Sequence, residues 1–134
     1  MDKFLDSMVR SRAGNRCEYC QLPQSVREFR FPIDHIIARQ HGGPTVLSNL
    51  ALCCGRCNLH KGPNLSGIDP ISGGMVRLFH PRVDLWNEHF QWNGEIISAL
   101  TPIGRATIAV LMMNHPDDVE IRRELIAMGV FYGS

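Results

Sequence analysis

Two short stretches, CEYC at residues 17–20 and CGRC at residues 54–57, decide how the first half of the chain folds. Each is a C-x2-C pair, and such a pair supplies two thiolates from one tight turn; zinc takes four thiolates tetrahedrally. We therefore expect one zinc ion bound by Cys17, Cys20, Cys54 and Cys57. Because a closed four-thiolate site leaves no position for substrate, this zinc should stabilise the fold rather than catalyse.

The fifth cysteine, Cys53, falls outside this spacing and is most simply a small buried hydrophobe. It could replace Cys54 only by stretching the second pair to C-x3-C. The start of the chain is charged and lacks the apolar core of a signal peptide, so we expect a cytoplasmic protein with reduced cysteines. In that setting the spacing favours a metal site, the alternatives being reduced core thiols or a redox pair.

The composition is that of one globular domain, residues 1–134, with 44% hydrophobic and 20% charged residues. No apolar run reaches 18 residues, so no membrane span is expected. Residues 1–62 hold nine Lys/Arg against five Asp/Glu, and residues 63–134 hold five against eight. The basic half would suit a polyanion such as nucleic acid, although an unevenly charged solvated surface would look the same.

The first half reads as a ββα unit with a helix in front. Residues 2–13 show helical periodicity, with Gly14-Asn15 to close the helix. Residues 27–36 alternate as a half-buried strand with Phe29, Phe31 and Ile33 on one face, and Pro32 confines that strand to an edge or marks its end. A second short extended segment precedes Cys54, and residues 55–64 predict a short helix stopped by Gly62-Pro63.

The second half predicts a hairpin followed by helices. Residues 63–78 are rich in Gly, Pro and Ser and predict a surface loop. Residues 89–101 predict a hairpin with Asn93-Gly94 as its two-residue turn. Helices are expected at 104–114 and 117–129.

Two finer points belong to this half. Asp117 is placed to cap the last helix and Gly129 to end it. Trp86 and Phe90, four residues apart, predict core positions.

Between the cysteine pairs, Asp34 and His35 stand side by side ahead of a loop that contains Gly42-Gly43. A carboxylate there could hold a metal ion, and an imidazole can take a proton near neutral pH. A plain turn could carry both residues, so their neighbours must decide.

The neighbours supply an ordered pattern: C-x2-C, DHI, GG, NLALC and C-x2-C-N-x2-K. Over residues 13–62 this resembles the HNH endonuclease family in its zinc-stapled ββα-metal form. The resemblance implies an α+β fold whose HNH core carries an N-terminal helix and a C-terminal hairpin-plus-helices extension, residues 79–134. It also implies a hydrolase that cuts phosphodiester bonds of DNA with one metal ion, leaving 5′-phosphate and 3′-hydroxyl ends.

The resemblance also implies residue roles. Asp34 and Asn58 would bind a catalytic Mg2+ or Mn2+, His35 would be the general base, and Asn49 would brace the loop that bears His35. Asn58 stands where the family often has histidine, while His60 lies roughly 200° further around the helix and is a metal or phosphate contact or a surface residue.

Lys61, Arg39 and Arg56 are candidate phosphate contacts or ordinary surface charges. His41 is expected to be an exposed loop residue, and His80 and Arg82 could extend a DNA surface. A zinc-stapled nucleic-acid-binding module without nuclease activity is the alternative function, and a thiol redox protein is a third. Monomer and homodimer both stay open.

Overall fold

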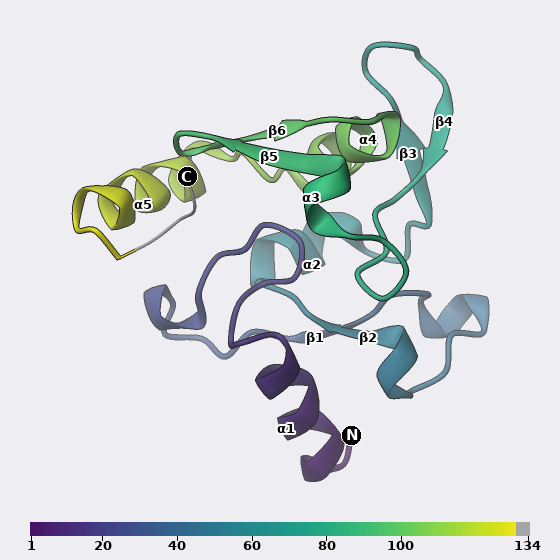
Figure 1. Cartoon of the computed structure of the whole chain (residues 1–134). Helices are drawn as coiled ribbons and strands as arrows, with labels where there is room; N and C mark the ends of the chain where they lie inside the picture. The colour runs from purple at the N-terminus through teal and green to yellow at the C-terminus, as the bar shows by residue number, and fades with distance from the viewer. Residues whose placement is uncertain (131–134) are drawn as a thin grey trace.

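The computed structural model describes residues 1–130 and has an α+β fold of short elements (Figure 1). Its strands form three separate two-stranded antiparallel sheets, β1–β2, β3–β4 and β5–β6. The elements are α1 (Lys3–Arg12), β1 (Ile33–His35), β2 (Leu50–Leu52), α2 (Gly55–Lys61), β3 (Ser66–Ile68), β4 (Met75–Arg77), α3 (Trp86–His89), β5 (Phe90–Asn93), β6 (Ile96–Ala99), α4 (Pro102–Leu111) and α5 (Pro116–Ala127). Within the described residues, no helix has the length and apolarity needed to cross a membrane.

The predicted ββα unit is confirmed as β1, β2 and α2, but its first strand is shorter than expected. Only three residue pairs join β1 to β2, from Ile33 opposite Leu52 to His35 opposite Leu50. Phe29 lies before the strand and is 86% exposed, whereas Phe31 is buried. The N–H of Phe31 donates to the side chain of Gln24 at 2.7 Å instead of to a strand partner, and Pro32 has no N–H to donate.

Helix α1 begins and ends where the sequence predicts. The side chain of Asp2 accepts a hydrogen bond from the N–H of Leu5, and Gly14 and Asn15 both take positive φ after the last turn. The helix attaches to the ββα unit through Arg12, whose guanidinium donates to the carbonyl of Leu50 at 2.7 Å.

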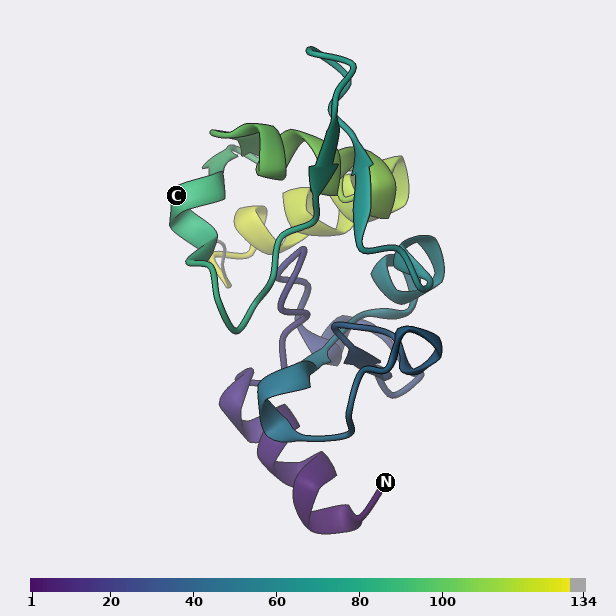
Figure 2. The ribbon, with the colours of Figure 1, turned by 90° about the vertical axis from the view of Figure 1, so that its right-hand side faces the viewer.

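Residues 63–78 correct the prediction of a plain surface loop, because they contain the β3–β4 hairpin. Its turn is organised by Asp69, which accepts from the N–H of Ile71 and from Nε and Nη2 of Arg105 on α4, both at 2.8 Å. Gly67 packs so closely on α4 that an added Cβ would lie 2.3 Å from Val110. The small residues that suggested a loop instead allow a tight hairpin to form. This hairpin projects away from the rest of the chain (Figure 2).

The β5–β6 hairpin and the two C-terminal helices are confirmed, with two shifts in detail. Asn93 pairs with Ile96, so the two-residue turn is Gly94-Glu95 rather than Asn93-Gly94. Helix α5 begins one residue earlier than predicted, and its N-cap is His115, whose Nδ1 accepts from the N–H of Asp117. Asp117 therefore sits in the first turn, since Pro116 occupies the first helical position.

The other predictions for this half hold. Gly129 follows the last turn of α5 with φ +71°. Trp86 and Phe90 pack their rings 5.1 Å apart, and Phe90 is buried.

The second half of the chain rests on the first. In Figure 1 the ribbon from β3 to α5 lies above β1, β2 and α1, with α2 between the two tiers and in contact with α4. The indole of Trp86 donates to the carbonyl of Tyr19 at 2.8 Å, and Arg82 forms an ion pair with Glu18. The C-terminal part therefore contacts the first cysteine pair. Arg82, for which the sequence suggested a place on a DNA surface, instead pairs with Glu18.

Candidate metal centre and active site

The four predicted cysteines come together in one buried cluster. The Sγ atoms of Cys17, Cys20, Cys54 and Cys57 all lie within 4.8 Å of one another. The Sγ atoms of Cys20 and Cys54 are 3.7 Å apart, close to the roughly 3.8 Å between two ligands of a tetrahedral zinc with Zn–S bonds of about 2.3 Å. The donor set and the spacing therefore fit zinc.

Each pair is formed by a tight turn in which a backbone N–H points at sulfur. The N–H of Cys20 donates to Cys17 Sγ, and that of Cys57 donates to Cys54 Sγ, both at 3.4 Å. Burial raises the pKa of Cys17, but hydrogen bonds from the surrounding thiols outweigh it and bring that pKa well below its usual range. Hydrogen bonding to Cys17 is in turn the largest cause that raises the pKa of Cys20 and of Cys57 well above the usual range, so without a cation the negative charge gathers on Cys17. A metal cation would balance the charge of further thiolates.

Cys53 is fully buried beside this cluster and is not one of its four ligands. Burial is the largest cause that raises the pKa of its thiol well above the usual range. It is therefore a protonated core thiol, as the spacing predicts.

The carboxylate of Asp34 is buried and held by Tyr19, inside the first cysteine pair, and by Lys61, on the helix that carries the second. The hydroxyl of Tyr19, from the first pair, donates to Oδ2 at 2.7 Å. The ammonium of Lys61, at the end of α2, lies 3.1 Å from Oδ2 and 3.3 Å from Oδ1. Burial raises the pKa of Asp34, and Lys61 and Tyr19 oppose that rise. The metal cluster thus fixes Asp34 through its own flanking residues.

This position removes Lys61 from the surface, where the sequence suggested a phosphate contact. Its side chain is only 2% exposed, and Nζ also donates to the carbonyl of Ile36 at 2.9 Å. A buried ammonium needs a carboxylate and several acceptors, and β1 supplies them. The sequence could not show this, because 27 residues separate Lys61 from Asp34.

His35 and Asn49 organise the loop that follows β1. His35 Nε2 lies 2.8 Å from the hydroxyl of Thr45. Asn49 accepts from the N–H of Ile37 at 2.9 Å and donates to the carbonyls of Ile37 and Pro44 at 3.0 and 2.9 Å. The amide of Asn49 therefore ties the start of the loop to its end.

Two further residues shape the same loop. At Gly43 an added Cβ would lie 1.7 Å from the carbonyl oxygen of Ile37, so no side chain fits there. The other is Thr45, the hydrogen-bond partner of His35, which was not predicted from the sequence. The one sequence feature that could have pointed to it is its position two residues after the double glycine.

One pocket of about 370 Å³ brings three of the predicted site residues together. Asp34, His35 and Asn58 all line it, and Arg39 lies on the same pocket. Asp34 and Asn58 offer the oxygen ligands that magnesium or manganese prefers. A carboxylate has about four acceptor positions, of which Tyr19 and Lys61 take the core side, so the donor set still fits a hard divalent ion. His60 does not line this pocket.

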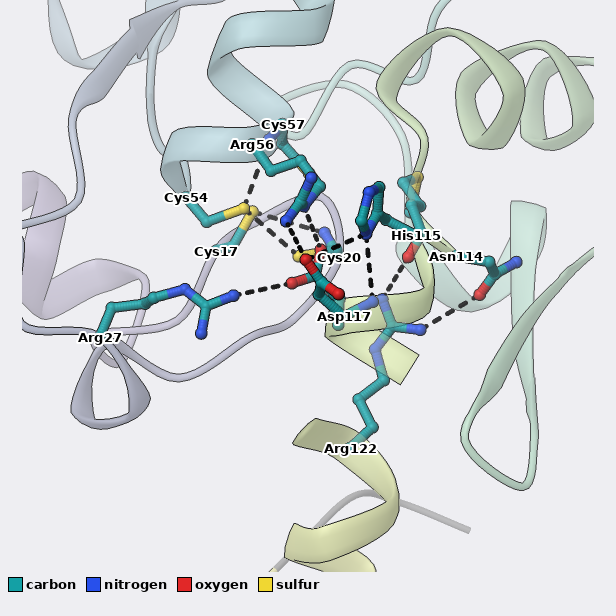
Figure 3. Close-up of polar contacts among 12 residues, drawn as sticks. Cys17, Cys20, Arg27, Cys54, Arg56, Cys57, Asn114, His115, Asp117 and Arg122 are labelled. Atoms are coloured by element: carbon teal, nitrogen blue, oxygen red, sulfur yellow. Dashed lines mark hydrogen bonds and ion pairs between the residues drawn. The ribbon is translucent and has the colours of Figure 1, made fainter. Parts of the chain in front are cut away.

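Arg56 faces α5 instead of open solvent. Its Nε lies 3.0 Å from Oδ2 of Asp118, and Arg27 binds Oδ1 of the same carboxylate at 2.9 Å. Asp118 is buried, so its carboxylate bridges Arg27, which follows the first cysteine pair, and Arg56, which lies inside the second. Figure 3 shows both arginines directed toward the start of α5, where Asp117 is labelled. His41, by contrast, is exposed, as predicted, and contacts the carbonyl of Pro63 at 3.1 Å.

The fold and the cluster define a ββα domain built around a four-cysteine metal site. Residues 17–64 match the family model described as HNH endonuclease, and this segment includes both cysteine pairs and all the residues named on the 370 Å³ pocket. This match agrees with the resemblance that the motif order suggested. No curated protein and no solved structure matches the chain.

Removing the Asp34 carboxylate should destabilise the fold as well as alter the pocket. In Asp34→Ala the ammonium of Lys61 stays buried without its partner, and breaking a buried pair in this way costs about 3–5 kcal/mol. Urea unfolding should report this loss, and a double variant, Asp34→Asn with Lys61→Met, should recover much of it. An Asp34→Ala protein as stable as wild type would show that the pair is not buried in solution.

Proposed function

We propose that the chain is a metal-dependent endonuclease that hydrolyses phosphodiester bonds of DNA. The observation that carries the proposal is the single pocket lined by Asp34, His35 and Asn58 within an HNH domain. A Mg2+ or Mn2+ ion held by Asp34 and Asn58 would stabilise the negative charge that develops at the scissile phosphate. The zinc cluster lies outside this pocket and acts by holding the flanking residues in place.

His35 is the proposed general base. With the Nε2 proton donated to Thr45, Nδ1 keeps its lone pair and can accept a proton from the attacking water. Thr45 then fixes the tautomer and the ring orientation, and Asn49 fixes the loop that carries both residues.

The remaining polar residues of the site divide into two groups. Arg39 is exposed on the pocket and is the proposed phosphate contact. Lys61 is a positioning residue that orients the Asp34 carboxylate, in place of the surface role suggested by the sequence.

A second candidate is a zinc-stapled nucleic-acid-binding module without nuclease activity. One observation favours it: the Asp34 carboxylate is already paired with Lys61, so a divalent ion must share a ligand whose charge is partly balanced. Both candidates bind nucleic acid, and only cleavage separates them.

Supercoiled plasmid should be nicked or linearised in Mg2+ or Mn2+ and left intact when these ions are chelated by EDTA under conditions that retain zinc. Asn58→Ala should raise the metal concentration needed for cleavage and leave the zinc content unchanged, because Asn58 is a half-buried side chain on the pocket. Asn64→Ala, an exposed residue that does not line the pocket, is the matched control.

Two results would count against the nuclease. Plasmid that is bound but uncut in both metals would favour the binding module. Activity that persists without Mg2+ or Mn2+ and follows the zinc content would move the chemistry to the cysteine cluster.

A further inference from the structure

A second pocket, of about 330 Å³, is lined in part by residues next in the chain to those of the Asp34 pocket. We call it the arginine pocket and define it by the six residues on which the argument depends: Phe29, Pro32, Leu59, Arg27, Arg30 and Arg56. Its volume lies within the range of about 300–1,000 Å³ that is usual for small-ligand sites.

The two pockets are neighbours along both elements that form them. Pro32 lines the arginine pocket and the next residue, Ile33, lines the Asp34 pocket. On α2, Leu59 faces the first and its neighbour Asn58 faces the second. Residues adjacent in the chain thus line both pockets, and we place one extended polymer strand across them in the proposal below.

The apolar wall of the arginine pocket is exposed to an unusual degree. Phe29 is 86% exposed and Leu59 is 75% exposed. Phe29 precedes β1 and contributes no buried surface to the core, which Phe31 and Leu22 supply instead. An aromatic face left open beside a pocket offers a stacking surface.

Three guanidinium groups border this aromatic face. The lining residues include three arginines and one aspartate, Asp118, and two carboxylates outside the lining, Asp117 and Asp6, pair with Arg56 and Arg30. Arg27 and Arg56 are fixed by the buried Asp118 carboxylate, while the side chain of Arg30 is 68% exposed and pairs at the surface with Asp6. Fixed guanidinium groups beside an exposed ring match a ligand that is both aromatic and anionic.

We propose that the arginine pocket binds an unpaired base of the nucleic acid strand whose phosphate lies in the Asp34 pocket. The base stacks on Phe29 against Leu59, and Arg30 contacts a flanking phosphate. This proposal rests on the proposed function and adds a substrate class to it: single-stranded or locally unpaired nucleic acid. Because every base has a π face that can stack, the pocket should select unpaired bases and discriminate little between base types.

Binding of a fluorescein-labelled single-stranded oligodeoxythymidylate, measured by anisotropy without divalent ions, tests the pocket separately from cleavage. Phe29→Ala should weaken binding about 5- to 100-fold, since stacking of one base contributes that much, and Phe29→Trp should retain it. Arg30→Ala should weaken binding and reduce its salt dependence. Phe4→Ala, which removes an equally exposed ring on α1 outside the pocket, should bind as wild type does.

A 2-aminopurine base placed in the oligonucleotide gives a second readout, because its fluorescence is quenched on stacking. Quenching by wild type that is lost in Phe29→Ala supports the proposal. If Phe29→Ala and Leu59→Ala bind and quench as wild type does while plasmid is still cut, the pocket is not a base site and the proposed function stands.

The other outcomes are equally distinct. If the expected binding differences appear but no metal supports cleavage, the pocket stands and the nuclease fails. If Phe29→Ala alters only the molar mass in solution, the exposed wall is an interface between two copies and the base site is overturned.

Discussion

Substitution of Cys57 by serine is expected to yield a chain that holds no zinc and does not reach its native fold. All four cysteines of the cluster are at most 2% exposed. Of the two residues that hold Asp34, Tyr19 lies inside the first pair and Lys61 stands one helical turn after the second. Zinc binding in small domains contributes about 10–16 kcal/mol, as much as the roughly 5–15 kcal/mol of net stability in a whole domain. Loss of the metal site therefore exceeds what the small β1–β2 core can offset.

Metal content by mass spectrometry and thermal unfolding by circular dichroism would measure this effect. Cys53→Ala is the matched control, because it changes a buried cysteine adjacent to Cys54 that is outside the cluster. That variant should keep one zinc per chain and lose only about 1 kcal/mol of stability. A folded, zinc-free Cys57→Ser protein, or a Cys53→Ala protein without zinc, would refute the assignment of the four ligands.

The His35→Ala variant should cut plasmid about 10²- to 10⁴-fold more slowly while its melting temperature and DNA affinity stay near those of wild type. The reason is that His35 is half-buried at the pocket and its ring makes one side-chain hydrogen bond, to the exposed Thr45. The imidazole is thus proposed to act in the chemical step and to add little to folding. Single-turnover cleavage rates beside melting curves would separate the two contributions.

His41→Ala provides the control for this experiment, since it removes an exposed histidine from the same loop. Thr45→Val should give a smaller fall in rate, because it releases the ring without removing it. Cleavage at the wild-type rate in His35→Ala would take the role of general base away from this residue.

The parts of the fold that the sequence predicts are those set by local spacing. The cysteine pairs, the short helix α2 and the β5–β6 hairpin depend on residues within a few positions of one another, and all are confirmed. Strand β1 was overestimated because the alternation of Phe29 and Phe31 continues past Pro32, whereas the backbone before Pro32 bonds to Gln24.

In residues 63–78 the sequence predicted too little regular structure, because these residues form the β3–β4 hairpin. A composition of Gly, Pro and Ser is shared by open loops and by tight hairpins, and only the Asp69–Arg105 pair distinguishes them. That pair joins residues 36 positions apart, beyond the reach of any local pattern.

For the candidate site, the sequence predicted side chains that line one pocket, but it did not predict the partners of the cations. Lys61 and Arg56 look like surface charges on a short helix, yet Lys61 lies in the core with Asp34 and Arg56 binds Asp118. Each partner is distant in the chain and could have been any carboxylate. Arg39, which makes no ion pair within residues 1–130, is the basic residue of the three that stays at the surface.

The bridge from Asp118 to Arg27 and Arg56 can form only after α5 has been synthesised. Cys57, the last ligand of the cluster, is translated 61 residues before Asp118. At roughly 5–20 residues per second, this interval lasts about 3–12 s. If the ion binds within this interval, α5 meets a cluster that is already formed. The Asp118 carboxylate is then expected to fix the two arginines and to play no part in bringing the cysteines together.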